Sequence, residues 1–600
     1  MMNKSRYMYL LVCALLAVAL FAFAACNQAE ETPAGTDDTV YGDEAATPAP
    51  QDETTGNNDE ETTEEPAPVS AGGTVTSVIL SESPFMDPIR QNDSATADIT
   101  VQMMEGLVRF TAYPYNEIEG VLATDWRQLD PVTWEFDLRQ GVYFHDGSYF
   151  TADAVVWSIE RLLDPREAAP GVFILEMVES VVAVDTYTVH IILEFPYVPI
   201  IGTLTHQVAF VMSPAALAEE VHARLANFEP FNVYDDDDEL VETVEEYVLT
   251  PWQEGAVAYA QGRGLTFDNP RMITANPVGT GPFVFQTRVS GDYTTMVPNQ
   301  NHWRSVPQFD YLIFRVIPDA VTRFAMMQAG EANVFPAQPA DVMQIPMHPQ
   351  IDLLVVAGTG IDYIGFNMTE GPLADQRVRH ALTLALNVDS VILGAYEGIG
   401  IPAVGPIGPN VLYSPHDYIE RMPFDPDRAR ELLAEAGYGD GLALRFWVNE
   451  GNAGRLATAE IAQHYWAQIG VDITIEILEW GTYLTHTAEG LHDLFMLGWT
   501  TVTGDPDYGT FSLFTTENFG NPGNRTFYSN PRVDELLLEG RMSTDSNRRR
   551  AIYRELPEIL AYDAPWIYIR HPITNWGSYG ISGFQVNFNN NPYFYGVTVN

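Results

Sequence analysis

The second half of the chain alternates between the apolar spacing of helices and that of strands. Residues 425–437 and 454–469 repeat apolar positions every three to four residues, and the first of them opens with the Asp-Pro pair that often starts a helix. Residues 442–448 form a mostly apolar run, and residues 471–477 alternate Val or Ile with polar residues. Strands and helices taking turns at these lengths predict an α/β fold with a parallel sheet.

The first half shows shorter alternating runs. Residues 74–80 are predicted to form a strand, residues 133–138 alternate as a half-buried strand does, and residues 181–195 are predicted to form two strands with a turn at Asp185. Residues 151–163 carry an apolar face behind a threonine that can cap a helix. His145 and Asp146 precede this helix and have the composition of a catalytic pair. Their place in a strand–turn–helix unit favours a structural role.

The amino end has the pattern of an export signal. Lys4 and Arg6 are followed by the apolar stretch 7–25, which ends in small residues before Cys26. This end is similar to a bacterial lipobox, so we expect residues 1–25 to be a signal peptide and Cys26 to become lipidated. A stretch of this length could instead remain as an uncleaved membrane-spanning anchor.

Two segments are strongly acidic. Residues 26–71 are rich in Glu, Asp, Thr and Pro and have almost no large apolar side chains, which predicts a disordered tether that ends where the fold begins near residue 72. A run of four aspartates, 235–238, lies in a long polar stretch. Calcium binding is one interpretation, but the spacing of a calcium loop is missing. A solvated charge run that begins a helix at Glu239 is the better prediction.

Composition excludes several functions. The formal charge of −51 makes nucleic acid a very poor partner. The two cysteines, Cys13 and Cys26, leave the body without a disulfide, a cysteine-bound metal or a cysteine nucleophile, and neither an HExxH nor a GxSxG motif occurs. We therefore expect no enzyme, no cofactor and no metal site. A carboxylate-dependent hydrolase using Asp505 and Asp507 is a minor alternative.

The stretch 493–511 is the best candidate for a ligand site. A short apolar run, Leu-Phe-Met-Leu, ends at Gly498 and Trp499, and a turn containing Gly-Asp-Pro follows at 504–506. Ligands in sheets flanked by helices usually lie at such loops. Trp499 offers an apolar wall and Asp505 a carboxylate.

Several motifs, in this order, resemble one family: the extracytoplasmic solute-binding proteins of peptide/nickel-type ABC importers, which include oligopeptide- and dipeptide-binding proteins. The resemblance covers roughly residues 73–575. The motifs are GVYFHDGSYFTADAVVWSIERLLDP, NPVGTGPF, RVIPDAVTRFAMMQAGE, IGFNMTEGPLADQRVRHALTLALNVDSVI, PFDPDRARELLAEAGY, FMLGWTTVTGDPDY and NPRVDELL.

The resemblance implies an α/β fold of two lobes, like the type II (cluster C) periplasmic binding proteins, with an extra smaller domain in the first lobe. The lobes would close on a ligand without changing it. The implied boundaries are a first lobe at 72–285 containing the extra domain (about 108–190) and an acidic insertion (214–262), a second lobe at 286–572, and a return to the first lobe at 573–600.

The resemblance also implies ligand-binding residues. In peptide-binding members, an aspartate three residues after the Trp of the GW motif pairs with the ligand's α-ammonium; here that position is Val502. Asp505 could replace it, or the ligand could be blocked, longer or not a peptide. The expected ligand-binding residues are Phe85, Met86, Tyr363, Asn367, Trp499, Thr500, Val502, Asp505 and Tyr508.

The implied partners are a peptide-like solute, the permease of an ABC importer and a membrane reached through the lipid anchor, with the protein acting as a monomer. An oligosaccharide or a metallophore remains an alternative ligand within the same family. Arg377 and Arg379 could bind a ligand carboxylate, although salt bridges on the surface of a helix are the preferred interpretation.

Overall fold

The structure, a computed structural model, describes residues 72–600 apart from 81, 84, 91–93, 114, 116, 235–239, 245, 451, 521–522 and 588. The expected signal peptide, Cys26 and the acidic tether lie outside the described residues. Residues 72–228 and 248–600 form one compact unit. The segment Glu229–Tyr247 contains a hairpin of its own, made of β8 (Phe231–Tyr234) and β9 (Leu240–Val244).

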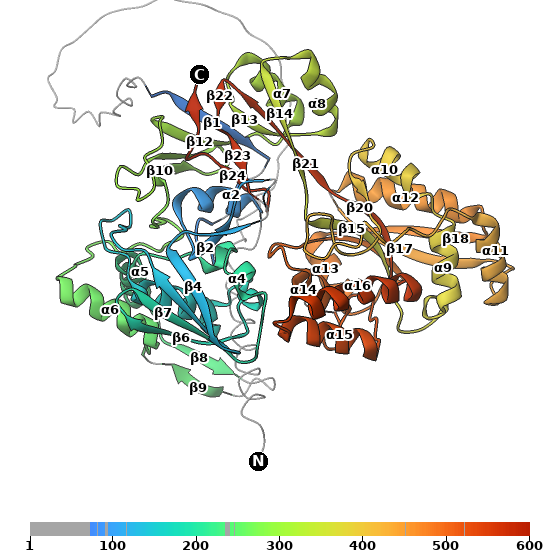
Figure 1. Cartoon of the computed structure of the whole chain (residues 1–600), viewed down its shortest axis with the longest axis horizontal. Coiled ribbons are helices and arrows are strands. Elements are labelled where there is room, and N and C mark those ends of the chain that lie inside the picture. Colours follow the sequence, from blue (N-terminus) through green and yellow to red (C-terminus); the bar gives the residue numbers. More distant parts are fainter. Residues whose placement is uncertain are drawn as a thin grey trace, which may run out of the picture. The chain divides into compact units, whose positions relative to one another are not determined.

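A seven-stranded sheet contains the first strand of the large unit and a strand from near its carboxyl end (Figure 1). Its order is β10 (Phe283–Val289), β11 (Tyr293–Pro298), β12 (Tyr311–Val316), β1 (Thr74–Ile79), β13 (Val334–Ala337), β21 (Ile573–Tyr579) and β14 (Ile351–Ala357). The parallel pairing of β1 with β12 and β13 places it in the middle of the sheet. Its associated helices are α2 (Ser94–Met103), α7 (Ala320–Ala329) and α8 (Pro339–Gln344).

A second sheet of six strands lies in the other lobe. Its order is β16 (Ile401–Pro402), β20 (Trp566–His571), β15 (Gly360–Phe366), β19 (Leu494–Thr500), β17 (Leu442–Asn449) and β18 (Val471–Leu478). One apolar core gathers residues of α9 (Gln376–Leu384), α10 (Val388–Tyr396), α11 (Pro426–Glu435) and α12 (Ala453–Ala467). A separate core gathers those of α13 (Trp480–Ala488), α14 (Pro506–Phe514), α15 (Pro531–Met542) and α16 (Ser546–Asp563). Two cores on one sheet show that it is covered on both faces.

A four-stranded antiparallel sheet follows β1 and α2 in the chain. It consists of β4 (Ala123–Asp130), β5 (Thr133–Leu138), β7 (Thr188–Leu193) and β6 (Val178–Asp185). The helices nearby in the sequence are α3 (Ala152–Leu163), α4 (Ile200–Thr203), α5 (Pro214–Ala226) and α6 (Pro251–Arg263). The remaining short strands are β2 (Val108–Phe110), β3 (Ile118–Gly120), β22 (Ile581–Ser582), β23 (Gln585–Val586), β24 (Pro592–Tyr593) and β25 (Thr598–Val599).

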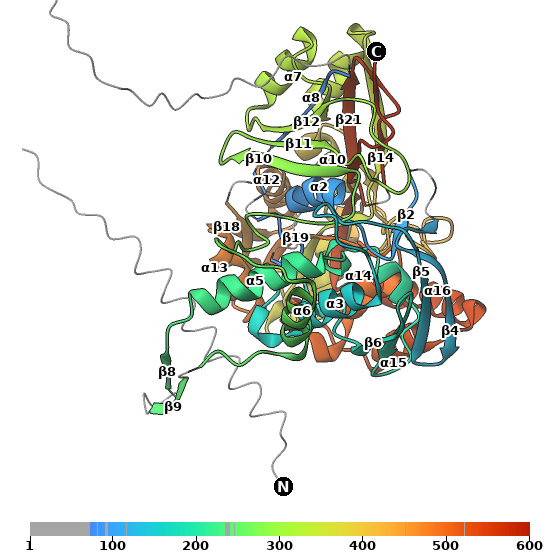
Figure 2. The ribbon, with the colours of Figure 1, turned by 90° about the vertical axis from the view of Figure 1, so that its left-hand side faces the viewer.

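The chain passes between the two large sheets at two adjacent points. It leaves β14 for β15 at Gly358 and Thr359, and it leaves β20 for β21 at Pro572. The amide of Gly358 donates to the Pro572 carbonyl at 2.9 Å. A Cβ at position 358 would lie 2.7 Å from that carbonyl oxygen, so only glycine fits here. Figure 2 shows β14 and β21 side by side, in agreement with their antiparallel pairing.

The structure corrects three expectations. The sheets divide the chain at residues 358–359, not at 286, because β12 pairs with β1 and draws β10–β14 into the first lobe. The six-stranded sheet is mixed: β17 is parallel to β18 and β19, whereas β15 is antiparallel to both of its main neighbours. Residues 240–244 form a strand where the charge pattern predicted a helix, since they pair with β8. The four aspartates before them lie outside the described residues.

Within residues 72–600, apart from the gaps given above, no helix combines the length and apolar character needed to cross a membrane.

Candidate functional site

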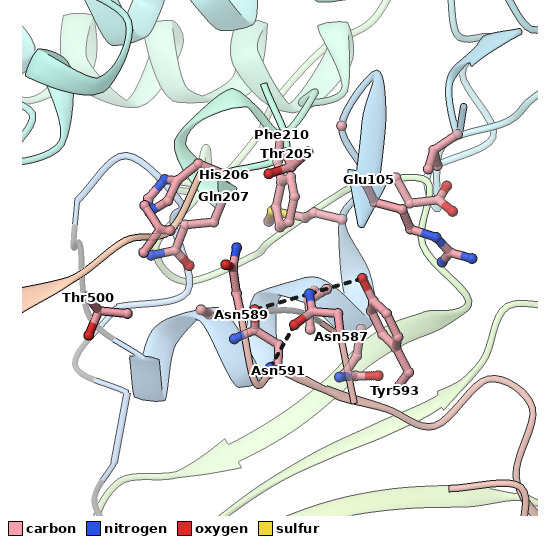
Figure 3. Close-up of a pocket in the computed structure, with 18 of the residues that line it drawn as sticks. Glu105, Thr205, His206, Gln207, Phe210, Thr500, Asn587, Asn589, Asn591 and Tyr593 are labelled. Atoms are coloured by element: carbon pink, nitrogen blue, oxygen red, sulfur yellow. Dashed lines mark hydrogen bonds between the residues drawn. The ribbon is translucent and has the colours of Figure 1, made fainter. Parts of the chain in front are cut away.

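A cavity of about 430 Å³ lies between the two lobes (Figure 3). The first lobe contributes residues of α2, of the segment 205–210 and of the carboxyl-terminal segment 587–595, and the second lobe contributes the end of β19 and the start of α14. Its volume falls in the range of small-molecule sites. Lining residues include Gln102, Met104, Glu105, Arg109, Phe173, Thr205, His206, Gln207, Phe210, Trp499, Thr500, Val502, Tyr508, Asn587, Asn589, Asn591, Tyr593 and Tyr595.

The second-lobe wall is the stretch that the sequence singled out. Trp499, Thr500, Val502 and Tyr508 all line the cavity. The rings of Trp499 and Tyr508 lie 5.4 Å apart, and Phe173 of the first lobe stacks on Tyr508 at 6.1 Å. The structure therefore brings four of the nine expected binding residues together and adds an aromatic partner from the other lobe.

Asp505 does not line this cavity. Its carboxylate forms a two-point salt bridge with Arg549, with distances of 2.7 and 2.8 Å, and it also caps α14 by accepting from the Asp507 amide at 3.0 Å. Arg549 is 4% exposed, so its charge depends on this carboxylate. The structure thus gives Asp505 a structural partner in place of the expected ligand ammonium.

Asp507 is also engaged. It is 1% exposed and accepts hydrogen bonds from the Tyr197 hydroxyl at 3.1 Å and from Arg541 at 3.3 Å. Burial raises the pKa of the Asp507 carboxyl, while Arg541 opposes this shift. Both carboxylates of the alternative hydrolase pair therefore belong to internal ion pairs.

The other four expected binding residues do not reach this cavity. Phe85 is 40% exposed and Met86 is buried in the core of the first lobe. Tyr363 is fully buried and stacks on Trp566 with ring centroids 3.4 Å apart. The side-chain amide of Asn367 donates to the carbonyls of Gly490 and His492 at 2.8 and 2.9 Å, so it holds a loop. Among these four residues only Tyr363 lies on a strand, β15, and its side chain points into the face of the sheet that is packed in the core.

Sequence reasoning missed the carboxyl-terminal wall. Figure 3 shows the amides of Asn587, Asn589 and Asn591 opposite the segment that carries Thr205, His206, Gln207 and Phe210. The Asn587 amide donates to Asn591 at 3.3 Å and to the Tyr593 hydroxyl at 3.2 Å, which fixes the segment's shape. A detectable signal was the run NFNNNPYFY, whose amides and aromatic rings are unusual for a chain end.

Other polar candidates have structural roles. His145 contacts the Gly281 carbonyl at 3.0 Å, and Asp146 accepts from Ser148 at 2.9 Å. Arg379 is buried and donates to backbone carbonyls, those of Leu373 and Ala564 among them, and Arg377 pairs with Asp375. Over the described part of the chain, no group of three or more metal-ligating side chains gathers in one place.

Known proteins share this architecture. The family model for bacterial extracellular solute-binding proteins, family 5, matches residues 117–521. The chain is 29% identical over 511 residues to heme-binding protein A of Haemophilus influenzae, covering 80% of this chain and 84% of that protein. It is 29% identical over 497 residues to the dipeptide-binding protein of Escherichia coli, covering 79% and 84%.

Solved structures of binding proteins are also similar to this chain. The structure of HbpA2 from Haemophilus parasuis has a TM-score of 0.72 at 28% identity and covers 88% of this chain and 100% of that one. The periplasmic binding protein DppA from Helicobacter pylori, in complex with the peptide STSA, has a TM-score of 0.70 at 25% identity and covers 88% and 98%. These relatives are binding proteins rather than enzymes, and they have the two-lobed fold that the sequence predicted. The chain belongs to family 5 of the bacterial extracellular solute-binding proteins.

Proposed function

We propose that this protein captures a peptide-like solute outside the cell and delivers it, unchanged, to an ABC importer in the membrane. The cavity between the lobes carries the proposal, because a site built from both halves of a two-lobed protein is sealed or opened by their relative movement. The relatives support the role: one is named a dipeptide-binding protein, and the Helicobacter pylori protein is described as associated with an ABC transporter.

In this proposal the cavity residues have distinct tasks. Trp499 and Tyr508 provide an apolar wall, and Thr500 and Val502 shape the end of β19 beside it. Phe173 of the first lobe stacks on Tyr508 of the second lobe, so an aromatic contact joins the two lobes beside this wall. Peptides fit such a site because they combine apolar side chains with hydrogen-bonding amides.

Ligand-induced stabilisation tests the proposal. The full-length chain in detergent is heated alone and with di- to hexapeptides, neutral oligosaccharides and metal chelates. A true ligand present at a hundred times its dissociation constant stabilises the folded state by about 2.7 kcal/mol. Trp499→Ala should abolish this gain, whereas Trp480→Ala, at a ring 45% exposed and outside the cavity, should not.

The identity of whatever the chain carries from its host provides a second measurement. Mass spectrometry of denatured protein should find a small solute in an amount comparable to the protein. Absence of any solute, with no stabilisation by any compound class, would contradict a role in capture. Steady consumption of a compound by the purified chain would indicate an enzyme instead.

The attachment is a separate part of the proposal. We place the signal peptide at residues 1–25, a lipid on Cys26 and a tether up to residue 71, with the protein acting as a monomer. Cys26→Ser should abolish incorporation of labelled fatty acid, and Cys13→Ser should not. Equal labelling of both variants would contradict lipidation at Cys26.

A further inference from the structure

The cavity between the lobes is polar, yet its charged groups already have partners within the protein. Among the described residues that line it, only Glu105 and Arg109 carry a formal charge near neutral pH. His206 also lines it, but burial lowers the pKa of its imidazole to about 4, so it is neutral there.

Glu105 has its partners on its own lobe. It is 8% exposed, and its carboxylate accepts hydrogen bonds from Thr280 at 2.8 Å and Trp303 at 3.0 Å, with His302 at 3.3 Å. Burial opposes ionisation, but these hydrogen bonds outweigh it and hold the pKa of Glu105 below its ordinary value. Both carboxylate oxygens are occupied, so a ligand ammonium would have to displace an existing partner.

The guanidinium of Arg109 also has partners within the protein. It pairs with Glu119 at 2.6 Å and lies over the rings of Tyr593 and Tyr595, 5.1 and 5.4 Å from their centroids. Glu119 also pairs with Arg304 at 3.3 Å, so the guanidinium of Arg109 shares its carboxylate with a second arginine and is covered by two aromatic faces. A ligand carboxylate would gain little from an arginine that is already paired.

The opposite wall brings no charge. Trp499, Thr500, Val502 and Tyr508 are neutral. The two carboxylates of this stretch, Asp505 and Asp507, are paired with Arg549 and Arg541. A ligand with a free ammonium or carboxylate would therefore lose its hydration without gaining a counter-charge, and burial of an unpaired charge is costly.

The carboxyl-terminal wall has unused hydrogen-bonding capacity. The carboxamide oxygen of Asn589 is buried without a hydrogen-bond partner among the described residues. Asn587 and Asn591 are hydrogen-bonded to each other. Figure 3 shows the side chain of Asn589 between this pair on one side and the segment that carries Gln207 on the other. A buried acceptor without a partner is expected where a ligand's N–H or O–H completes the set.

We propose that the ligand of this cavity carries no net charge at either end and is rich in hydroxyl or amide groups. It lies with an apolar face on Trp499 and Tyr508 and donates hydrogen bonds to Asn589 and its neighbours. Two kinds of molecule supply this chemistry: a neutral oligosaccharide, and a peptide blocked at both termini. This inference rests on the proposed role in solute capture: a blocked peptide would narrow the peptide-like ligand proposed above, and a neutral oligosaccharide would replace it.

Matched ligand pairs test the charge requirement by calorimetry on the full-length chain. One set compares a dipeptide with its N-acetyl, amide and doubly blocked forms, and the other compares a neutral oligosaccharide with the same chain ending in a uronic acid. In whichever of the two sets binds to the protein, the uncharged compound should bind at least tenfold more tightly than the charged compounds of the same set. Binding by the peptide set identifies a blocked peptide, and binding by the sugar set identifies an oligosaccharide.

Two variants link the result to the cavity. Asn589→Leu should lower the affinity for the neutral ligand at least fivefold. It should leave the melting temperature of the ligand-free protein unchanged, because the replaced oxygen has no hydrogen-bond partner among the described residues. Val502→Asp should lower the affinity for the neutral ligand and raise the affinity for compounds with a free amine. Val321→Asp adds the same charge at an exposed position of α7 and should change neither.

The outcomes separate this inference from the proposed function. Tighter binding of the unblocked dipeptide, or of the N-acetyl form with a free carboxylate, would overturn the inference and leave the capture role intact. Unchanged neutral-ligand affinity in Asn589→Leu would overturn the predicted contact. No binding by any compound, and no solute recovered from the host, would contradict both.

Discussion

Arginine carries almost all of the positive charge of this protein, since Lys4 is the only lysine. Several arginines are buried against carboxylates, and these pairs decide which acidic residues are available to a ligand. Arg161 is fully buried with Asp87 and Glu220, and Arg549 is buried with Asp505. The planar guanidinium suits such sites because it can bond a carboxylate at two points.

The Asp505–Arg549 pair predicts a large stability effect. Asp505→Asn leaves the buried guanidinium without its counter-charge, and removal of one partner of a buried pair costs about 3–5 kcal/mol. We expect the midpoint of urea unfolding to fall accordingly.

Glu539→Gln provides a matched control for that change. Its pair with Arg548 has both side chains about 40% exposed, and such pairs contribute about 0–1 kcal/mol. Equal losses in the two variants would contradict a structural role for Asp505. A loss of ligand binding by Asp505→Asn without a loss of stability would restore it as a ligand contact.

At the scale of elements, the sequence predicted several helices and strands, mainly in the second half of the chain, but not their partners. Asp425 and Pro426 begin α11 as the capping pattern indicated, and the alternating run after Gly470 is β18. The lobe boundary was missed because the pairing of β1 with β12 joins residues more than two hundred positions apart. Local periodicity contains no information about such contacts.

The same limit applies to the candidate site. The turn after β19 was predicted because its strand and turn signals are local. The wall formed by Asn587 to Tyr593 was not, since its place depends on the return of the chain to the first lobe. Tyr363 and Asn367 were assigned to the cavity because a strand pattern does not tell which face is covered by helices.

Close packing at the end of α2 explains one glycine of the NPVGTGPF motif. A Cβ at Gly281 would lie 2.5 Å from the backbone carbon of Met103, and the Gly281 amide donates to the Met103 carbonyl at 2.9 Å. Gly281→Ala must therefore move backbone, with a cost of about 1–3 kcal/mol in unfolding free energy. Thermal unfolding with calorimetric detection measures it.

The contrasting substitution is Gly262→Ala, near the end of α6. A Cβ there meets no atom within 4 Å, and the residue is helical. Alanine should stabilise the protein by about 0.5–1 kcal/mol, because glycine loses more conformational freedom in a helix. If both variants changed stability in the same direction, the packing explanation for Gly281 would be wrong.

At the scale of the whole molecule, buried histidines predict a dependence of stability on pH. Burial lowers the pKa of His206 to about 4 and the pKa values of His492 and His571 to about 3. The unfolded chain binds these protons near pH 6.5, while the folded protein does not. The contribution of these neutral histidines to the unfolding free energy is therefore fully present above about pH 6.5. It is lost progressively as the pH falls toward 3.

Replacement of one ring measures this effect. His492→Leu should reduce the fall in melting temperature between about pH 7 and pH 5, because one proton fewer is taken up on unfolding. The control is His464→Leu, which removes an exposed ring. An unchanged slope in His492→Leu would exclude this histidine as a source of acid sensitivity.

The net charge of −51 predicts a dependence on salt. Like charges repel in the compact state, and the Debye length falls from about 10 Å at 0.1 M salt to about 3 Å at 1 M. Sodium chloride should therefore raise the melting temperature at pH 7. The increase should shrink near pH 4, where many carboxylates are protonated, and an equal increase at both pH values would point to a non-electrostatic salt effect.

The position of β1 in the middle of its sheet has a mechanical consequence. A pull applied at residue 72 acts along β1, which is flanked by β12 and β13, and the other end of the chain returns to the same lobe through β21. The load therefore never crosses the junction at Gly358 and Pro572. If the protein is attached to a surface through its amino end, the first lobe bears the load, and the second lobe can move relative to it without tension.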